Sequence, residues 1–272
     1  MAFDLLAITI SIDPVAFTLG PLSVRWYGLM YVAGILAAVL VLRRLAPRLG
    51  ARVDELWDLA VLAIPAGLLG GRLYYVAQNR PGYYLDHPAE VFAVWEGGMA
   101  FFGAIIAVAA VTIAFARWRH ISVWPLLDAM AVAALVGQPF GRLGNVINGD
   151  VIGYETTVPW ATRYVHERAF VPELGVPYHP AAAYAILANL LLLGFLVVLL
   201  RRKTVPGAIF ALYLVGYSIT QFIVFFWRDN TVTLLGLKQA QLSAIVVALV
   251  GAALLYAVTR HRNGPEALPR AR

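Results

Sequence analysis

The hydrophobic positions of this chain are gathered into seven long runs, with the polar residues concentrated between them. Each run is close to the ~20 residues that a helix needs to cross the hydrocarbon core of a bilayer. The pattern therefore predicts an all-α, polytopic membrane protein with seven transmembrane helices in a single membrane domain, residues 1–272. The predicted spans are residues 23–42, 57–77, 97–116, 123–141, 181–200, 205–227 and 239–259.

Two segments outside these spans are long enough to have structure of their own. Residues 1–22 contain two prolines and a glycine, and we expect a lead-in outside the cytoplasm with a short interfacial helix. Residues 142–180 are polar and are predicted to form a small extracytoplasmic cap between the fourth and fifth spans.

Composition agrees with the membrane class and excludes several chemistries. The chain is 61% hydrophobic and 13% charged, which is outside the range of soluble domains. It has no cysteine, so disulfides, a thiolate nucleophile and a cysteine metal site are excluded. The first basic residue is Arg25, so no cleavable signal peptide is predicted. We predict no cofactor, no metal and no nucleic-acid partner.

The basic residues predict the orientation in the membrane. Cytoplasmic loops retain an excess of Lys and Arg, and 13 of the 21 lie in the segments after spans one, three, five and seven. The N-terminus is therefore predicted to lie outside and the C-terminus in the cytoplasm.

One stretch at the end of the fourth span, residues 137–153, is dense in polar groups and glycine. Polar residues at membrane depth usually face the protein interior or a wet cavity and have a function. Glycine lets the backbone leave helical geometry and approach a ligand closely. An arginine beside amides and bare backbone N–H groups suits a phosphate or carboxylate, so an anion site is predicted here. The polar residues are Arg142, Asn145, Asn148 and Asp150, and the glycines between them are Gly141, Gly144, Gly149 and Gly153.

Two further arginines fall toward the same end of the predicted spans. Arg72 lies in the second span, and Arg228 follows the sixth. Together with Arg142 they favour an anionic lipid headgroup, although Arg72 could equally be structural.

The stretch GRLGNVINGDVIG, residues 141–153, resembles the signature of the bacterial prolipoprotein diacylglyceryl transferases. Shorter similarities cover most of the chain: SVRWYGLMYVAG (23–34), GGRLYY (70–75), WEGGMAFFG (95–103) and HPAAAY (179–184). The seven-span topology is also that of the family.

The resemblance implies transfer of the diacylglyceryl group of phosphatidylglycerol to the lipobox cysteine of a preprolipoprotein, with release of glycerol phosphate. The expected partners are phosphatidylglycerol, the preprolipoprotein signal peptide and membrane lipids, and the expected location is the bacterial cytoplasmic (inner) membrane. By motif, Arg142 would hold the lipid phosphate, Asn145 and Asp150 would order the headgroup pocket, and Tyr27 would line it. Gly144, Asn148, Gly149 and Gly153 would shape its backbone.

The chain departs from the family pattern where a proton is handled. The family has a His where this chain has Phe102, and an Arg and a Glu in the sixth span where this chain has Gln221 and Phe225. An acid of the family is replaced by Ala185, and the signature Glu is the shorter Asp150. An alternative function is therefore a degenerate member that binds anionic phospholipid or a lipoprotein precursor without catalysis. A transporter or channel is disfavoured, because the polar residues cluster at one end of the spans.

Overall fold

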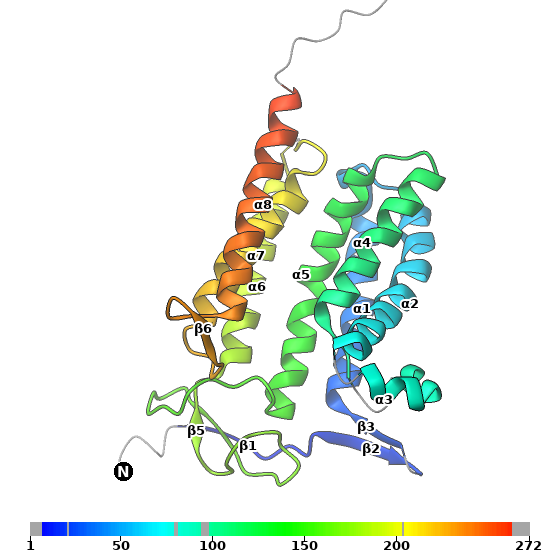
Figure 1. The fold of residues 1–272 in the computed structure, drawn as a ribbon. Helices are drawn as coiled ribbons and strands as arrows, with labels where there is room; N and C mark the ends of the chain where they lie inside the picture. Colours follow the sequence, from blue (N-terminus) through cyan, green and yellow to red (C-terminus); the bar gives the residue numbers. More distant parts are fainter. Residues whose placement is uncertain (1–6, 21, 79–80, 94–97, 203, 263–272) are drawn as a thin grey trace, which may run out of the picture. The chain divides into compact units, whose positions relative to one another are not determined.

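The computed structural model describes residues 7–20, 22–78, 81–93, 98–202 and 204–262 and is mostly helical (Figure 1). The long helices overlap the seven apolar runs, with ends that differ by up to seven residues. The helices are α1 (Trp26–Leu49), α2 (Val53–Gln78), α3 (Pro81–Asp86), η2 (Pro88–Phe92), α4 (Phe101–Trp118), α5 (Val123–Asn148), α6 (Ala181–Leu199), α7 (Ala208–Val224) and α8 (Gln239–Arg262).

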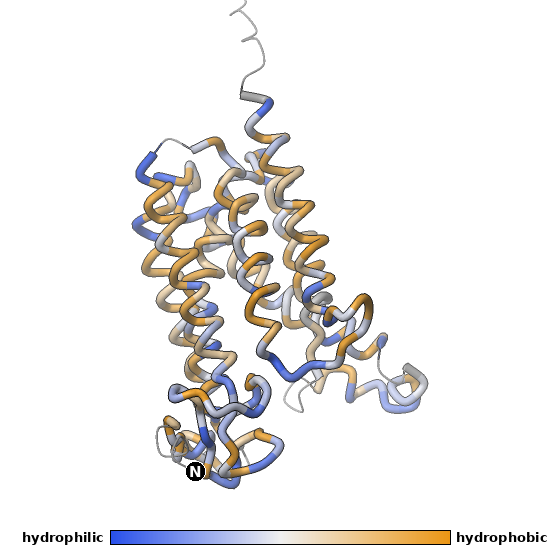
Figure 2. The backbone as a smooth tube through the Cα atoms, turned by 90° about the vertical axis from the view of Figure 1, so that its left-hand side faces the viewer, coloured by the Kyte–Doolittle hydropathy of each residue, from blue (hydrophilic) through white to orange (hydrophobic). Residues whose placement is uncertain are grey.

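Within the described residues, five helices are long and apolar enough to cross a membrane: α1, α2, α5, α6 and α8. Two shorter apolar helices correspond to α4 and α7. Hydrophobic residues dominate these helices, and hydrophilic ones gather at their ends (Figure 2). The prediction of a polytopic membrane protein is confirmed, while seven crossings stay a prediction.

Helix α5 does not end where the glycines begin. It continues through Gly141 and Gly144 to Asn148, beyond the predicted end of the fourth span at residue 141, and the bounds of the span itself stay a prediction. The glycines serve close packing against α1, because a Cβ at Gly144 would lie 2.9 Å from the Cα of Tyr27. The chain leaves the helix only at Gly149, whose φ of 79° is the left-handed conformation that ends many helices.

The lead-in is extended, and the interfacial helix predicted for residues 1–22 is wrong for its described part. Strands β2 (Val15–Leu19) and β3 (Leu22–Arg25) form an antiparallel hairpin. Strand β1 (Ile8–Ile10) pairs in parallel with β4 (Thr162–Tyr164), which pairs with β5 (Pro177–Tyr178). A third sheet has two strands, β6 (Val232–Leu234) and β7 (Leu237–Lys238), and joins α7 to α8. The all-α class therefore holds for the long apolar helices and not for these strand segments.

The contacts divide the chain into two compact units, residues 46–129 and residues 1–45 with 130–272, and each is described by itself. The single membrane domain stays a prediction. In unit 46–129, α2 packs on α4 through two glycines, because a Cβ at Gly103 would lie 2.3 Å from the carbonyl oxygen of Gly70. In the other unit α7 packs against both α6 and α8.

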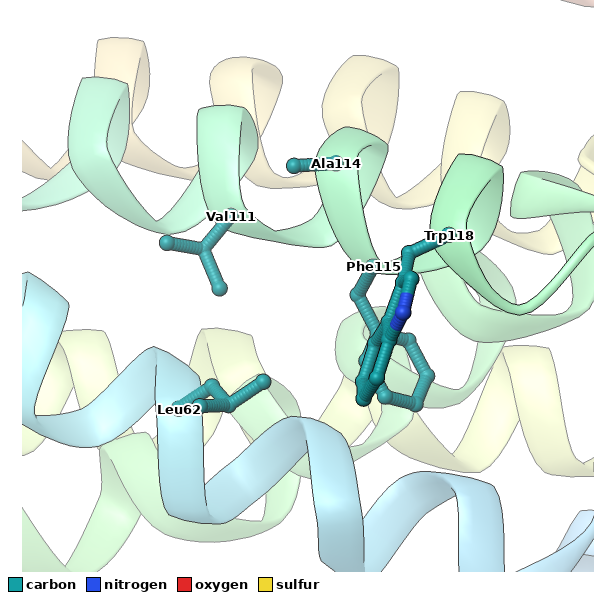
Figure 3. Close-up of a pocket in the computed structure, with 5 residues that line it drawn as sticks. All are labelled: Leu62, Val111, Ala114, Phe115 and Trp118. Atoms are coloured by element: carbon teal, nitrogen blue, oxygen red, sulfur yellow. The ribbon is translucent and has the colours of Figure 1, made fainter.

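An apolar pocket of about 280 Å³ lies between α2 and α4 (Figure 3). Leu62 lines it from α2, and Val111, Ala114, Phe115 and Trp118 line it from α4. The lining offers hydrocarbon and two aromatic rings and no titratable group, so it suits an acyl chain better than a reaction.

Candidate functional site

Three polar side chains are hydrogen-bonded in series at the C-terminal end of α5. Arg142 and Asn145 are one helical turn apart, and Nη1 of Arg142 donates to Oδ1 of Asn145 at 3.3 Å. Nδ2 of Asn145 donates in turn to the two carboxylate oxygens of Asp150, at 3.0 and 3.2 Å. Asn145 is buried, whereas Asp150 is exposed beyond the helix end. The amide therefore holds an arginine and a carboxylate in one fixed arrangement.

The predicted aromatic residue Tyr27 lies against the same end of α5. Tyr27 packs so closely on Gly144 that a Cβ at Gly144 would lie 3.0 Å from its ring atom Cδ2. The hydroxyl of Tyr27 lies 3.3 Å from that of Tyr31. Its phenol interacts electrostatically with both Arg142 and Asp150. Tyr27 thus lies beside the last turns of α5, and its part in a headgroup pocket stays a prediction.

Arg228 joins this group from the segment that follows α7. Its guanidinium lies over the Phe225 ring, 4.6 Å from the centroid, and interacts with the charges of Arg142 and Asp150. Burial, and secondly the charge of Arg142, lower the pKa of Arg228 to about 10, so it remains a cation at neutral pH. Its Nε is buried and has no hydrogen-bond partner among the described residues. Two guanidinium groups with one carboxylate leave an excess of positive charge that favours an anion.

The glycine-rich loop after α5 holds the Arg228 segment directly. Gly153 forms an antiparallel bridge with Arg228, and the Tyr154 N–H donates to the carbonyl oxygen of Trp227 at 3.0 Å. The Gly153 N–H donates to the carbonyl oxygen of His179 at 2.9 Å. A Cβ at Gly153 would lie 2.0 Å from the Trp227 oxygen, so only glycine fits this junction.

Asn148, in the last turn of α5, is hydrogen-bonded to two residues from distant segments of the chain, Arg25 and Phe170. Its Oδ1 accepts a hydrogen bond from Nη1 of Arg25 at 3.1 Å, and its carbonyl oxygen accepts one from the Phe170 N–H at 2.9 Å. The Arg25 guanidinium also lies 4.1 Å from the centroid of the Phe170 ring. Sequence reasoning missed Arg25, since its partners lie far away in the chain.

Lys238 is a buried cation that the sequence did not connect to the site. Its Nζ donates to the carbonyl oxygens of Phe225, at 2.6 Å, and of Arg228, and it lies over the Tyr154 ring, 4.8 Å from the centroid. A cation near the end of α7 also suits the negative end of the helix dipole. Lys238 therefore fixes the backbone that carries Arg228.

Replacing Lys238 with methionine is expected to lower the free energy of unfolding by about 2 to 3 kcal/mol, because buried carbonyls lose a charged donor. The thermal midpoint in detergent measures this loss. The matched control is Arg168→Met, because Arg168 is exposed and its pair with Asp13 contributes about 0 to 1 kcal/mol. Equal losses in the two variants would show that the hydrogen bonds of Lys238 to Phe225 and Arg228 do not stabilise the fold.

Arg72, the remaining predicted phosphate ligand, belongs to unit 46–129, so its place relative to Arg142 is not described. It is only 4% exposed and donates to the backbone oxygens of Glu90, Val91 and Gly98. These bonds give Arg72 a structural task in its own unit, and its role as a phosphate ligand stays a prediction.

The positions that depart from the family pattern have different surroundings. Gln221 is buried in α7, and its Nε2 has no hydrogen-bond partner among the described residues. Phe225 supports the guanidinium of Arg228. The side chain of Phe102 lies outside the described part of the structure.

His179 lies beside Gly153, whose N–H donates to its carbonyl oxygen. Its Nδ1 lies 3.0 Å from the Tyr184 hydroxyl, which also accepts a hydrogen bond from Nε1 of Trp160 at 2.8 Å. Burial lowers the pKa of His179 below its usual value, so the ring is neutral at pH 7.

Comparison with known proteins gives one consistent result. The family profile described as prolipoprotein diacylglyceryl transferase matches residues 14–257. The phosphatidylglycerol–prolipoprotein diacylglyceryl transferase of Geobacter sulfurreducens is 38% identical over 93% of this chain and 98% of its own length. The proteins of that name from Cupriavidus metallidurans and Lysinibacillus sphaericus are 37% and 34% identical, over 95% and 91% of this chain and 97% and 93% of their own lengths.

Proposed function

We propose that this chain, which belongs to the prolipoprotein diacylglyceryl transferase family, transfers the diacylglyceryl group of phosphatidylglycerol to the cysteine thiol of a preprolipoprotein. The observation that carries the proposal for the site is the group at the end of α5, where Asn145 links Arg142 to Asp150 and the charge of Arg228 acts on both.

This arrangement suits the leaving group of the reaction. The thiolate sulfur attacks the glycerol carbon, a C–S bond forms, and the C–O bond to the phosphate breaks with its electron pair on oxygen. Glycerol phosphate leaves with additional negative charge, so preorganised cations lower the barrier. We assign phosphate binding to Arg142 and Arg228, and the positioning of Arg142 to Asn145 and Asp150.

The acceptor thiol must lose its proton, and its ordinary pKa is about 8.5. The thiol comes with the substrate, because the chain has no cysteine. The neutral imidazole of His179 and the carboxylate of Asp150 belong to the same unit as Arg142, and each is able to accept a proton. We propose that one of them replaces the histidine that the family pattern has at Phe102.

We also propose the seven-span topology, with the N-terminus outside, the C-terminus in the cytoplasm, and the site at the outer face of the bacterial cytoplasmic membrane. The distribution of Lys and Arg supports it, as 13 of 21 follow the odd-numbered spans. The short helices α4 and α7 support it as well, since the 17 residues of α7 reach the lower limit for a crossing.

The purified protein is expected to move labelled diacylglyceryl from phosphatidylglycerol to a synthetic lipobox peptide and to release glycerol phosphate in equal amount. The matched control is the same peptide with its cysteine replaced by serine. This peptide should accept no diacylglyceryl group, because a serine hydroxyl is almost entirely protonated at neutral pH and is a poor nucleophile. Label on the serine peptide would contradict thiol transfer.

The second candidate is a family member that binds anionic phospholipid without catalysis, and the substitutions at Phe102, Gln221 and Phe225 favour it. Absence of transfer, with phosphatidylglycerol still raising the thermal midpoint, would select this candidate.

A further inference from the structure

The β6–β7 hairpin, which joins α7 to α8, ends in an exposed apolar tip. Its strands pair in antiparallel register, Leu234 with Leu237, and the turn between them is Leu235–Gly236. From Asn230 to Leu237 there is no charged residue. Val232, Leu234 and Leu235 are all exposed, Leu235 by 85%.

The backbone at the tip is unusual for a leucine. Leu235 has a φ of 52°, in the left-handed region, and Gly236 follows with 73°. Two-residue hairpin turns with both φ values positive favour Asn–Gly, and a leucine there costs about 1 to 2 kcal/mol. In water, an exposed leucine in this conformation gains nothing to offset that cost. A leucine at this position is therefore explained by an apolar partner outside the chain.

The adjoining helix indicates which partner this is. Apolar residues remain exposed at the end of α7 and beyond it, at Ile223, Phe226 and Trp227. Tryptophan is enriched at the level of the lipid headgroups, and Trp227 lies a few residues before the hairpin. The apolar tip thus continues the lipid-facing surface of α7.

We propose that the β6–β7 hairpin inserts its tip, Leu234 and Leu235, into the outer leaflet of the membrane and thereby holds Arg228 at headgroup level. The proposal rests on the topology given under the proposed function. The base of the hairpin is held to the segment that carries Arg228, because Lys238 donates to the carbonyl oxygens of Phe225 and Arg228. Anchoring the tip in the membrane would therefore also fix the depth of the Arg228 guanidinium. A phospholipid in this leaflet could then present its phosphate to Arg228 without leaving the bilayer.

The absence of cysteine allows a direct test of insertion. Leu235→Cys is labelled with an environment-sensitive fluorophore in the full chain reconstituted in phosphatidylglycerol-containing vesicles. Spin labels placed high on the lipid acyl chains are expected to quench it several-fold more than aqueous iodide does. The matched control is Leu174→Cys, an exposed leucine that also precedes a left-handed glycine, Gly175. Stronger quenching of the Leu235 probe by iodide than by the lipid labels would overturn the proposal.

A second variant separates membrane contact from folding. Leu235→Asn suits the left-handed turn, so the thermal midpoint in detergent is expected to stay equal or rise. The KM for phosphatidylglycerol in vesicles is expected to rise several-fold at constant kcat, with no change for a water-soluble short-chain donor. An unchanged KM in vesicles would overturn the role in lipid access. The quenching does not depend on activity, so an inactive wild-type protein would count against the transferase and not against insertion.

Discussion

Replacing Arg142 with alanine is expected to reduce diacylglyceryl transfer by about 10²- to 10³-fold, the effect of removing one preorganised donor from a developing negative charge. The loss should fall mainly on kcat, because the charge on the departing phosphate grows in the transition state. Asn145 would also lose its donor and could turn away from Asp150, so the geometry of the site suffers with its charge.

The matched control is Arg168→Ala, which removes an exposed arginine of the cap that pairs with Asp13. It should leave transfer, and stabilisation by phosphatidylglycerol, unchanged. Arg142→Lys should recover only part of the activity, since lysine keeps the charge and loses the planar fork. Equal losses in Arg142→Ala and Arg168→Ala would show that Arg142 is not the phosphate ligand.

Replacing Gly153 with alanine is expected to lower the free energy of unfolding by at least about 3 kcal/mol and to abolish transfer. The new Cβ would lie 2.0 Å from the carbonyl oxygen of Trp227 and 2.8 Å from the Cβ of His179, and a backbone atom cannot rotate away. The bridge between Gly153 and Arg228 would open, and the guanidinium would leave its place near Arg142.

Thermal unfolding in detergent and the transfer assay together measure the effect of Gly153→Ala. The control is Gly194→Ala in α6, where an added Cβ would meet nothing within 4 Å. That variant should match the wild type, or exceed it slightly in stability, because alanine favours a helix. Similar losses in both variants would show that the effect comes from substitution of glycine as such.

The sequence alone determined the membrane class and the set of polar side chains that meet at the end of α5. Long apolar runs need only composition and length to be recognised, because every backbone group in hydrocarbon must be satisfied within its own helix. The joint presence of Arg142, Asn145 and Asp150 was readable for a similar reason. Partners three to five residues apart are brought together by one helix and its cap, without help from the rest of the fold.

Tertiary structure decided what the glycines do. A glycine-rich stretch is compatible with an unwound backbone or with a tightly packed helix, and the sequence predicted the former. The neighbour of Gly144 is Tyr27, more than a hundred residues earlier, so nothing local distinguishes the two cases. Contact with α1 keeps the helix intact to Asn148 and leaves only Gly149 to end it.

The strands and the supporting cations were likewise beyond the sequence. Strand β1 pairs with β4, and Arg25 finds Asn148, over separations of more than a hundred residues. In the sequence, Lys238 cannot be distinguished from an ordinary loop lysine. In the fold, the packing of α7 and α8 places its amine within hydrogen-bond distance of the carbonyl oxygens of Phe225 and Arg228. The sequence determined which groups act locally, and only the packing of distant segments decided how they are held, because such contacts leave no periodic pattern in the chain.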